Sequence, residues 1–386
     1  MKRIESIDIA RGIVMIIMAL DHTRDLIHID SLTQNPTDLN TTSTVLFFTR
    51  WITHLCAPVF VFLSGVSAYL SFTQSRDEVA SKKYLLTRGL WLILLDMTII
   101  NFILWFDVHF TILLFNVVAT IGFGFIFLSQ VLKIPSRTLG ILGLCILIFH
   151  GFVPLIPFAE LSLIKKILMP LFSPGSFPFG SGNVFVMGYP PIPWLGIMLV
   201  GFATGPLFES NMKARKKILI KLSLVSILLF LLIRSMNGYG DPIPWSHQKD
   251  ALFTLLSFIN VTKYPPSLDF CLLFLGILCI ILFLVEGLDN QLVKPLVIYG
   301  RVPLFYFIVH FFILHILLMI ILLIQGNHLT DLIFGSNFGR PKGISGLRLP
   351  FIYMIWLGLV ISLYPLCRWF GNYKAKHPEK KWLRYI

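Results

Sequence analysis

The fold class is decided by residues 6–25, SIDIARGIVMIIMALDHTRD, where an apolar run long enough to cross a bilayer ends in a cluster of charged side chains. A membrane-spanning helix needs about 20 mostly apolar residues. Nine more such runs follow, so the sequence predicts an all-α, polytopic integral membrane protein with about ten transmembrane helices. The predicted ranges are 9–29, 45–73, 84–106, 110–132, 138–158, 191–208, 218–236, 268–286, 303–324 and 350–370.

The least regular part of this pattern lies between the fifth and sixth ranges. Prolines interrupt the chain repeatedly between residues 154 and 178. A short eleventh span or a re-entrant segment would fit the same region, so eleven transmembrane helices are the alternative to ten.

The overall composition also indicates a membrane protein. Apolar residues make up 56% of the 386 residues and charged residues only 13%, about half the charge of a soluble domain. Lys and Arg outnumber Asp and Glu by 32 to 19, but so apolar a chain has no soluble basic face for nucleic acid. We therefore expect the lipid bilayer as a partner, no nucleic acid, and a single transmembrane domain over residues 1–386 with a short cytoplasmic tail at about 371–386.

The distribution of Lys and Arg predicts the orientation. Cytoplasmic loops of membrane proteins carry an excess of these residues. If the amino terminus is cytoplasmic, the inner segments hold 21 of the 32 basic residues and the outer segments hold eight. The sequence thus predicts a multi-pass protein of the cell membrane with both termini in the cytoplasm.

Ionisable side chains cluster at the end of the first predicted helix, where they are costly. A charged side chain near the bilayer centre costs about 2.5–3.5 kcal/mol on insertion scales, which makes these residues functional candidates. Asp21 and Arg24 share one helix face, and Asp25 lies in the same turn. His22 follows Arg11 by eleven residues, about 16 Å along a helix, which places it near mid-bilayer. The alternative is a salt-bridged helix end that faces water.

The second predicted helix adds Arg50 and His54, four residues apart and at a similar depth. Pro58 follows and should kink this helix. Two neighbouring helices would then offer His, Arg and Asp to one outward-facing pocket. Either His22 or His54 would be a suitable general base in such a pocket.

One short motif occurs twice. Tyr189-Pro190-Pro191 and Tyr264-Pro265-Pro266 each precede an apolar run. Proline suits the first turn of a helix, so both motifs predict helix starts at the outer side. The positive ends of these helices would favour an anionic group, although helix starting alone explains the motif as well.

Four groups of residues near the two ends of the chain form a recognisable set. They are Ser6-Ile7-Asp8-Ile9-Ala10-Arg11-Gly12 with Asp21-His22-Thr23-Arg24-Asp25, Lys263-Tyr264-Pro265-Pro266-Ser267-Leu268, Tyr299-Gly300-Arg301-Val302-Pro303-Leu304-Phe305-Tyr306 with His310, and Tyr364-Pro365-Leu366-Cys367-Arg368-Trp369. As a set they resemble the bacterial proteins grouped with the heparan-α-glucosaminide N-acetyltransferase catalytic domain.

A more distant likeness is to the large family of membrane acyltransferases that decorate surface sugars. Its members have Arg-Gly at the entry of the first span and His eleven residues after the Arg, as Arg11 and His22 are placed here. This resemblance implies a role in acyl transfer for Arg11 and His22. In the lysosomal acetyltransferase the position that matches His22 looks like asparagine, which leaves His28 and His54 as alternatives.

The residues and the resemblance together imply a membrane-embedded acyltransferase. The resemblance implies acetyl-CoA or another acyl-CoA as the donor, arriving from the cytoplasm, and a glycan or small-molecule acceptor with a hydroxyl or amine at the outer side. No metal is expected. We expect His22 or His54, oriented by Asp21 or Asp25, to be catalytic, and the residues that bind substrate or acyl-CoA to be Arg11, Arg24, Arg50, Arg88, Arg301 and His310.

Two other functions use the same residues. A proton-coupled transporter would need Asp21, His22 and Arg24 as a proton relay. A structural or assembly protein would have this cluster fully paired and closed to water. The sequence leaves the oligomeric state open, with a homodimer among the alternatives.

Overall fold

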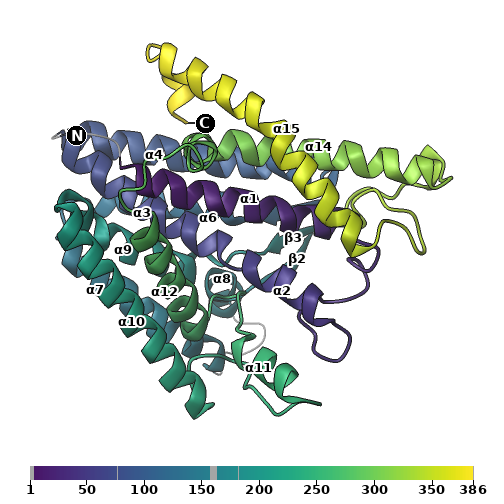
Figure 1. Cartoon of the computed structure of the whole chain (residues 1–386), viewed down its shortest axis with the longest axis horizontal. Coiled ribbons are helices and arrows are strands. Elements are labelled where there is room, and N and C mark those ends of the chain that lie inside the picture. The colour runs from purple at the N-terminus through teal and green to yellow at the C-terminus, as the bar shows by residue number, and fades with distance from the viewer. Residues whose placement is uncertain (1–3, 76, 157–162, 181, 386) are drawn as a thin grey trace.

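The computed structural model of this chain describes residues 4–75, 77–156, 163–180 and 182–385. Helices make up 70% of it, and eight helices of the described part are long and apolar enough to cross a membrane (Figure 1). Each coincides with a predicted range, so the chain is a multi-pass membrane protein. The eight are Thr44–Ser75, Glu78–Trp105, Ser136–Leu155, Pro191–Glu209, Met212–Met236, Leu268–Val285, Pro303–Ile324 and Leu349–Lys376.

The two remaining predicted ranges also form helices, but of a different kind. Val117–Val131 is apolar and shorter than the eight. Glu5–Ile27 carries too many charged residues to be counted with them. Helices and strands follow the order α1 (Glu5–Ile27), α2 (Thr44–Thr53), α3 (Cys56–Ser75), α4 (Glu78–Leu95), η1 (Asp96–Ile100), α5 (Asn101–Trp105), β1 (Ile112–Phe115), α6 (Val117–Val131), α7 (Ser136–Phe149), η2 (His150–Leu155), α8 (Leu163–Phe172), β2 (Gly175–Phe179), β3 (Asn183–Met187), α9 (Pro191–Thr204), η3 (Gly205–Glu209), α10 (Met212–Met236), α11 (Ala251–Ile259), α12 (Leu268–Val285), α13 (Lys294–Arg301), α14 (Pro303–Ile324), η4 (Leu329–Asp331), α15 (Leu349–Lys376) and η5 (Lys381–Arg384).

Helix α1 lies inside the bundle. It packs against α2, α3, α12, α13, α14 and α15 (Figure 1). Sixteen of its 23 residues are buried, including Asp8, Asp21 and Arg24, so its charged side chains face protein rather than lipid.

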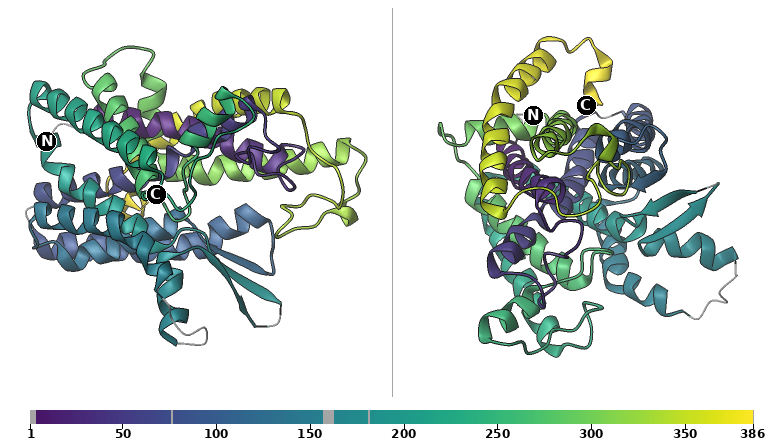
Figure 2. Two further views of the ribbon diagram at one scale, coloured as in Figure 1. Left: turned by 90° about the horizontal axis from the view of Figure 1, so that it is seen from below. Right: turned by 90° about the vertical axis from the view of Figure 1, so that its right-hand side faces the viewer.

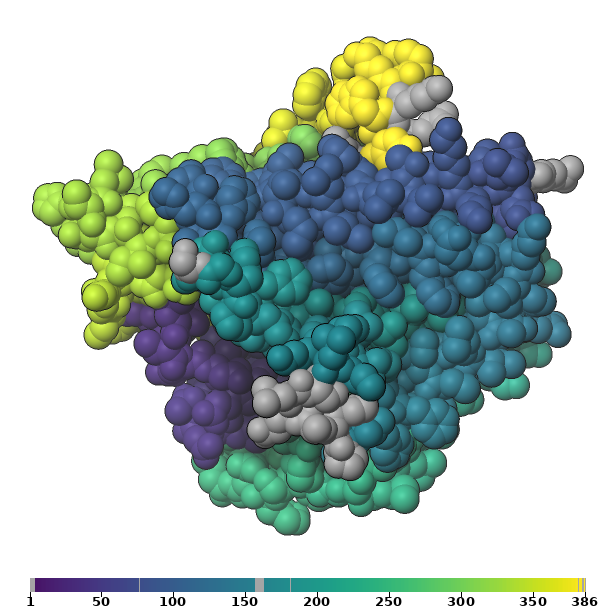
Figure 3. Space-filling view, turned by 180° about the vertical axis from the view of Figure 1, so that it is seen from behind, coloured from purple at the N-terminus to yellow at the C-terminus, as the bar shows by residue number. Residues whose placement is uncertain are grey.

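Helix α15 is the opposite case, since only 17% of its apolar window is buried and it stands at the edge of the molecule (Figure 3). An exposed apolar face of this kind suits contact with lipid chains.

The second spanning segment is broken where the sequence predicts a kink. Helix α2 ends at Thr53 and α3 begins at Cys56. Pro58 has no N–H to donate to the carbonyl of His54, and its ring crowds that carbonyl, which favours a kink or a break at this point. Next to the break, Thr53, Cys56 and Ala57 line a cavity.

A small sheet departs from the all-α prediction. Strand β3 lies in the middle, parallel to β1 and antiparallel to β2. Asn101 fixes β1, because its side chain donates to the Leu114 carbonyl at 2.9 Å and accepts from the Leu114 N–H at 2.7 Å. For this reason the helix predicted from residue 110 begins only at Val117. The sheet and α8 project from the side of the bundle (Figure 2).

The proline-rich region, for which an eleventh span or a re-entrant segment is the alternative, includes this projection. Its described part forms η2, α8 and the β2–β3 hairpin, and α8 has no buried residue. Residues 157–162 of this region lie outside the described residues.

The segment that follows α14 is tied to the end of α1. The guanidinium of Arg340, 1% exposed, donates to the carbonyls of His28 and Ile29 at 2.9 and 3.1 Å and to the Ser31 hydroxyl at 2.7 Å. Phe338 of the same segment lines the cavity at this end of α1. These hydrogen bonds of Arg340, called the Arg340 clamp, hold the segment with Phe338 against one side of that cavity.

We expect Gly12→Ala to destabilise the protein, because α1 and α13 meet here backbone to backbone. A methyl group on Gly12 would overlap the backbone of Leu296, and one on Gly300 would overlap the carbonyl of Asp8. Overpacking of this kind costs about 1–3 kcal/mol. The measurement is the unfolding midpoint of the purified protein in detergent.

The matched control is Gly358→Ala in α15, where an added methyl group meets nothing within 4 Å. This control should leave the midpoint unchanged or slightly raised, since Ala favours helix. An equal fall in both variants would contradict the close approach of α1 and α13.

Candidate functional site

Two cavities lie along α1. The first, called the N-side cavity, has a volume of about 370 Å³ and is lined by the first half of α1 from Arg11 onward. The second, called the C-side cavity, has a volume of about 360 Å³ and is lined by the second half of α1 as far as Leu26. Four apolar side chains line both cavities and therefore lie between them; this shared wall, called the apolar constriction, consists of Met18, Phe60, Val117 and Phe307.

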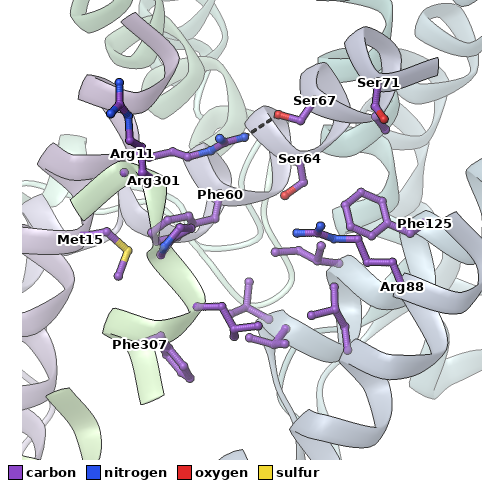
Figure 4. Close-up of a pocket in the computed structure, with 18 of the residues that line it drawn as sticks. Arg11, Met15, Phe60, Ser64, Ser67, Ser71, Arg88, Phe125, Arg301 and Phe307 are labelled. Atoms are coloured by element: carbon purple, nitrogen blue, oxygen red, sulfur yellow. Dashed lines mark hydrogen bonds between the residues drawn. The ribbon is translucent and has the colours of Figure 1, made fainter. Parts of the chain in front are cut away.

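The N-side cavity is basic and rich in hydroxyl groups. Arg11 donates to the Leu63 carbonyl at 3.1 Å and to the Ser67 hydroxyl at 2.5 Å. Arg11 and Arg301 lie on one side of the cavity and Arg88 on the other (Figure 4). Guanidinium and hydroxyl groups that converge in this way suit the oxygens of phosphate groups. The polar lining consists of Arg11, Arg88, Arg301, Lys374, Ser64, Ser67, Ser71 and Tyr84.

A larger crevice of about 840 Å³ lies beside the N-side cavity, along α13 and α15. It shares Arg301 and Lys374 with that cavity and adds Lys294 and Arg368. Glu5 and Asp289 also line it. The crevice therefore extends the basic surface outward from the N-side cavity.

The C-side cavity is bordered by an ion network centred on Asp21. The carboxylate of Asp21 accepts from Arg24 at 3.1 Å and also from Arg50 of α2. Arg24 in addition contacts Asp25 at 2.5 Å. Buried charges are tolerated when each has a partner, and here two carboxylates balance two guanidiniums. The network joins α1 to α2.

His22 belongs to a pair of histidines in contact. Its Nδ1 lies 2.7 Å from Nε2 of His310 on α14. Nδ1 of His310 lies 2.9 Å from the carbonyl oxygen of Tyr306. A carbonyl can only accept, so His310 carries its proton on Nδ1 and, when neutral, accepts at Nε2.

The direction of this chain of hydrogen bonds determines the state of His22. Its Nδ1 must donate to His310, which leaves Nε2 of His22 with a free lone pair. His22 lines the C-side cavity, and its ring is held by Phe307 and Phe311 at centroid distances of 5.9 and 4.3 Å. We infer that His22 is oriented as a proton acceptor beside the constriction.

The structure brings together most of the residues predicted for the site. Asp21, His22, Asp25 and Arg50 line the C-side cavity, and Arg11, Arg88 and Arg301 line the N-side cavity. Two residues stand behind the lining: Arg24, which holds the two aspartates, and His310, which is fully buried.

The structure also gives the positions of His54 and of the side chain that contacts His22. His54 does not line either cavity, because its ring faces Phe270 and Phe274 of α12 at centroid distances of 6.1 and 5.9 Å. His22 contacts His310, whereas the Asp21 carboxylate contacts Arg24 and Arg50.

Three residues of the C-side cavity were not predicted as site residues. Lys263 lines it although it is only 7% exposed. Tyr189 and Tyr264 also line it, with their hydroxyl oxygens 3.1 Å apart. Burial would raise the pKa of the Tyr264 phenol, but the charges of Lys263 and Arg50 lower it below its usual value. The repeated Tyr-Pro-Pro motif was the sequence signal for the tyrosines.

The arrangement combines a histidine-lined cavity, a basic cavity and a wall of apolar side chains between them. Such a site can hold a long anionic molecule whose reactive end reaches His22. Among residues 4–75, 77–156, 163–180 and 182–385, no group of three or more His, Cys, Asp or Glu side chains is arranged to hold a metal ion.

The family comparison gives one match. The model described as heparan-alpha-glucosaminide N-acetyltransferase, catalytic, matches residues 3–239. No curated protein matches the chain. The matched range contains Asp21, His22 and Arg50, whereas Lys263 and His310 follow it.

We expect Asp21→Asn to destabilise the protein strongly, because it leaves Arg24 and Arg50 without the carboxylate that both contact. Breaking a buried ion pair typically costs about 3–5 kcal/mol. The unfolding midpoint in detergent measures the effect, and the double variant Asp21→Asn with Arg50→Gln should recover part of the loss.

The matched control is Glu78→Gln, which breaks the exposed pair between Glu78 and Lys133. An exposed pair contributes about 0–1 kcal/mol, so little change is expected. Equal effects of Asp21→Asn and Glu78→Gln would rule out the central place of Asp21.

Proposed function

Because the chain belongs to the family of the heparan-alpha-glucosaminide N-acetyltransferase catalytic domain, we propose that it is a membrane acetyltransferase that uses acetyl-CoA or another acyl-CoA. The acceptor is a hydroxyl or amine of a glycan or small molecule. The observation that carries the proposal is the meeting of a basic cavity and a histidine-lined cavity at one apolar constriction. The sugar in the family's name is not carried over to this chain.

Acyl-CoA occupies the N-side cavity in this proposal. Coenzyme A is anionic at its phosphates and uncharged at its thioester, and the cavity is basic at its outer part and apolar at the constriction. Arg11, Arg88 and Arg301 would hold the diphosphate. The crevice with Lys294 and Arg368 would take the phosphorylated adenosine.

His22 acts as the general base. The acceptor O–H or N–H gives its proton to Nε2 of His22 while its oxygen or nitrogen forms a bond to the thioester carbonyl carbon. The C–S bond then breaks, and the coenzyme A sulfur takes the proton from the His22 imidazolium. His310 is a positioning residue, since it holds His22 in the tautomer that leaves Nε2 free.

Transfer is direct rather than through an acylated enzyme. The donor and the acceptor would occupy different cavities, so both can be bound at once. Proximity in such a ternary complex lowers the barrier without a covalent intermediate.

The N-side cavity faces the cytoplasm in this proposal, and both termini lie there. The support is the charge bias of the loops, with 21 of 32 Lys and Arg on that side. Lys374, near the end of α15, lines the same cavity as Arg11 of α1, so these two helix ends share one side of the bundle. The acceptor then enters the C-side cavity from outside.

We expect His22→Gln to abolish transfer of a labelled acetyl group from acetyl-CoA in membranes. Loss of a general base costs about 10²–10⁴-fold in rate. His54→Gln is the matched control and should keep most of the activity, because His54 does not line the cavities. Full activity of His22→Gln, or loss only in His54→Gln, would refute the assignment.

Replacing His310 separates its positioning role from mere packing. His310→Gln keeps an acceptor for the Nδ1 proton of His22 and should retain part of kcat. His310→Leu removes the acceptor and should lower kcat while leaving the KM for acyl-CoA nearly unchanged. If both variants lost activity to the same extent, the hydrogen bond to His22 would have no part in the reaction.

A further inference from the structure

The charges of the C-side cavity do not balance. Asp21 and Asp25 are matched by Arg24 and Arg50. Lys263 is a third cation at the same cavity, and it forms no ion pair with a carboxylate among the described residues. Lys263 is nevertheless buried, with only 7% of its surface exposed.

Lys263 lies beside Tyr264, at a cavity that Asp21, Asp25 and Arg50 also line. Its ammonium lies 5.1 Å from the centroid of the Tyr264 ring. The Tyr264 hydroxyl lies 3.1 Å from that of Tyr189. Both hydroxyls face the same cavity, so together with the ammonium they offer several hydrogen-bond donors to one ligand.

Two helices add to the positive character of this end. Helix α9 begins at Pro191, two residues after Tyr189, and α12 begins at Leu268, four residues after Tyr264. The amino-terminal end of a helix carries a partial positive charge. The repeated motif thus places the starts of two helices close in sequence to Tyr189 and Tyr264, which line the cavity with Lys263.

A buried charge is costly unless an opposite charge meets it. We therefore propose, building on the acyltransferase function above, that the acceptor carries an anionic group, a carboxylate or a phosphoryl group, which Lys263, Tyr189 and Tyr264 bind. This contact holds the acceptor's hydroxyl or amine beside His22. Lys263 is thus a specificity-determining residue.

Measuring anion binding tests the proposed anionic acceptor site without requiring turnover. The unfolding midpoint of the full-length protein in detergent, with coenzyme A in excess to fill the N-side cavity, is measured with inorganic phosphate, with glucuronate and with glucose. At least one anion should raise the midpoint and glucose should not. Whichever anion stabilises more identifies the group as phosphoryl or carboxylate.

Three variants make the result specific. Lys263→Gln should weaken anion binding at least about tenfold, whereas Lys263→Arg should retain it. Arg88→Gln should weaken coenzyme A binding and keep the anion effect. Stabilisation by glucose equal to that by the anions, or an anion effect that survives in Lys263→Gln, would overturn the proposal.

The experiments distinguish failure of the acyltransferase proposal from failure of the anionic-acceptor proposal. If no acetyl transfer is found but the anion effect depends on Lys263, the acyltransferase function is wrong and the anion site stands. If transfer depends on His22 and no anion effect is seen, the anionic acceptor is wrong and the acyltransferase function stands.

Discussion

A helix that carries charge at membrane depth must be enclosed by protein, and α1 is such a helix. Its sequence places Asp8, Arg11, Asp21, Arg24 and Asp25 on an otherwise apolar segment. Exposure of these groups to lipid would cost several kcal/mol, so six other helices surround it. The glycine contacts with α13 and the hydrogen bonds of Arg340 to the end of α1 are part of this enclosure.

Enclosure also determines where the chemistry lies. Charges that pair with each other close the interior, as Asp21 does with Arg24 and Arg50. Polar groups that face a cavity keep it open to a ligand, as His22 does in one cavity and Arg88 in the other. The fully internally paired cluster expected of a purely structural protein is therefore only part of what is found. The paired side chains of Asp21, Asp25 and Arg50 line the C-side cavity together with His22.

Periodicity and apolar length predicted the membrane class and the positions of the spanning helices, because hydrophobic burial acts over whole segments. They could not predict the β1–β3–β2 sheet, since its strands depend on contacts such as Asn101 with Leu114. The prediction of the site was limited for the same reason, because it also depends on contacts between distant parts of the chain. His22 and His54 look equivalent in sequence, but only His22 lines the C-side cavity, whereas His54 faces Phe270 and Phe274. His310 as the partner of His22 lies 288 residues away, which no local pattern encodes.

The site is assembled from two parts of the chain with different roles. The segment matched by the family supplies His22, the ion network and much of the basic cavity. His310 and Lys263 come from the segment after it, one in contact with His22 and one in the lining of the C-side cavity. In the proposed reaction the base needs a fixed tautomer whatever the acceptor, whereas a buried cation that forms no ion pair is useful only if the acceptor brings an anion. The acceptor of this chain should therefore be sought through the residues that follow position 239.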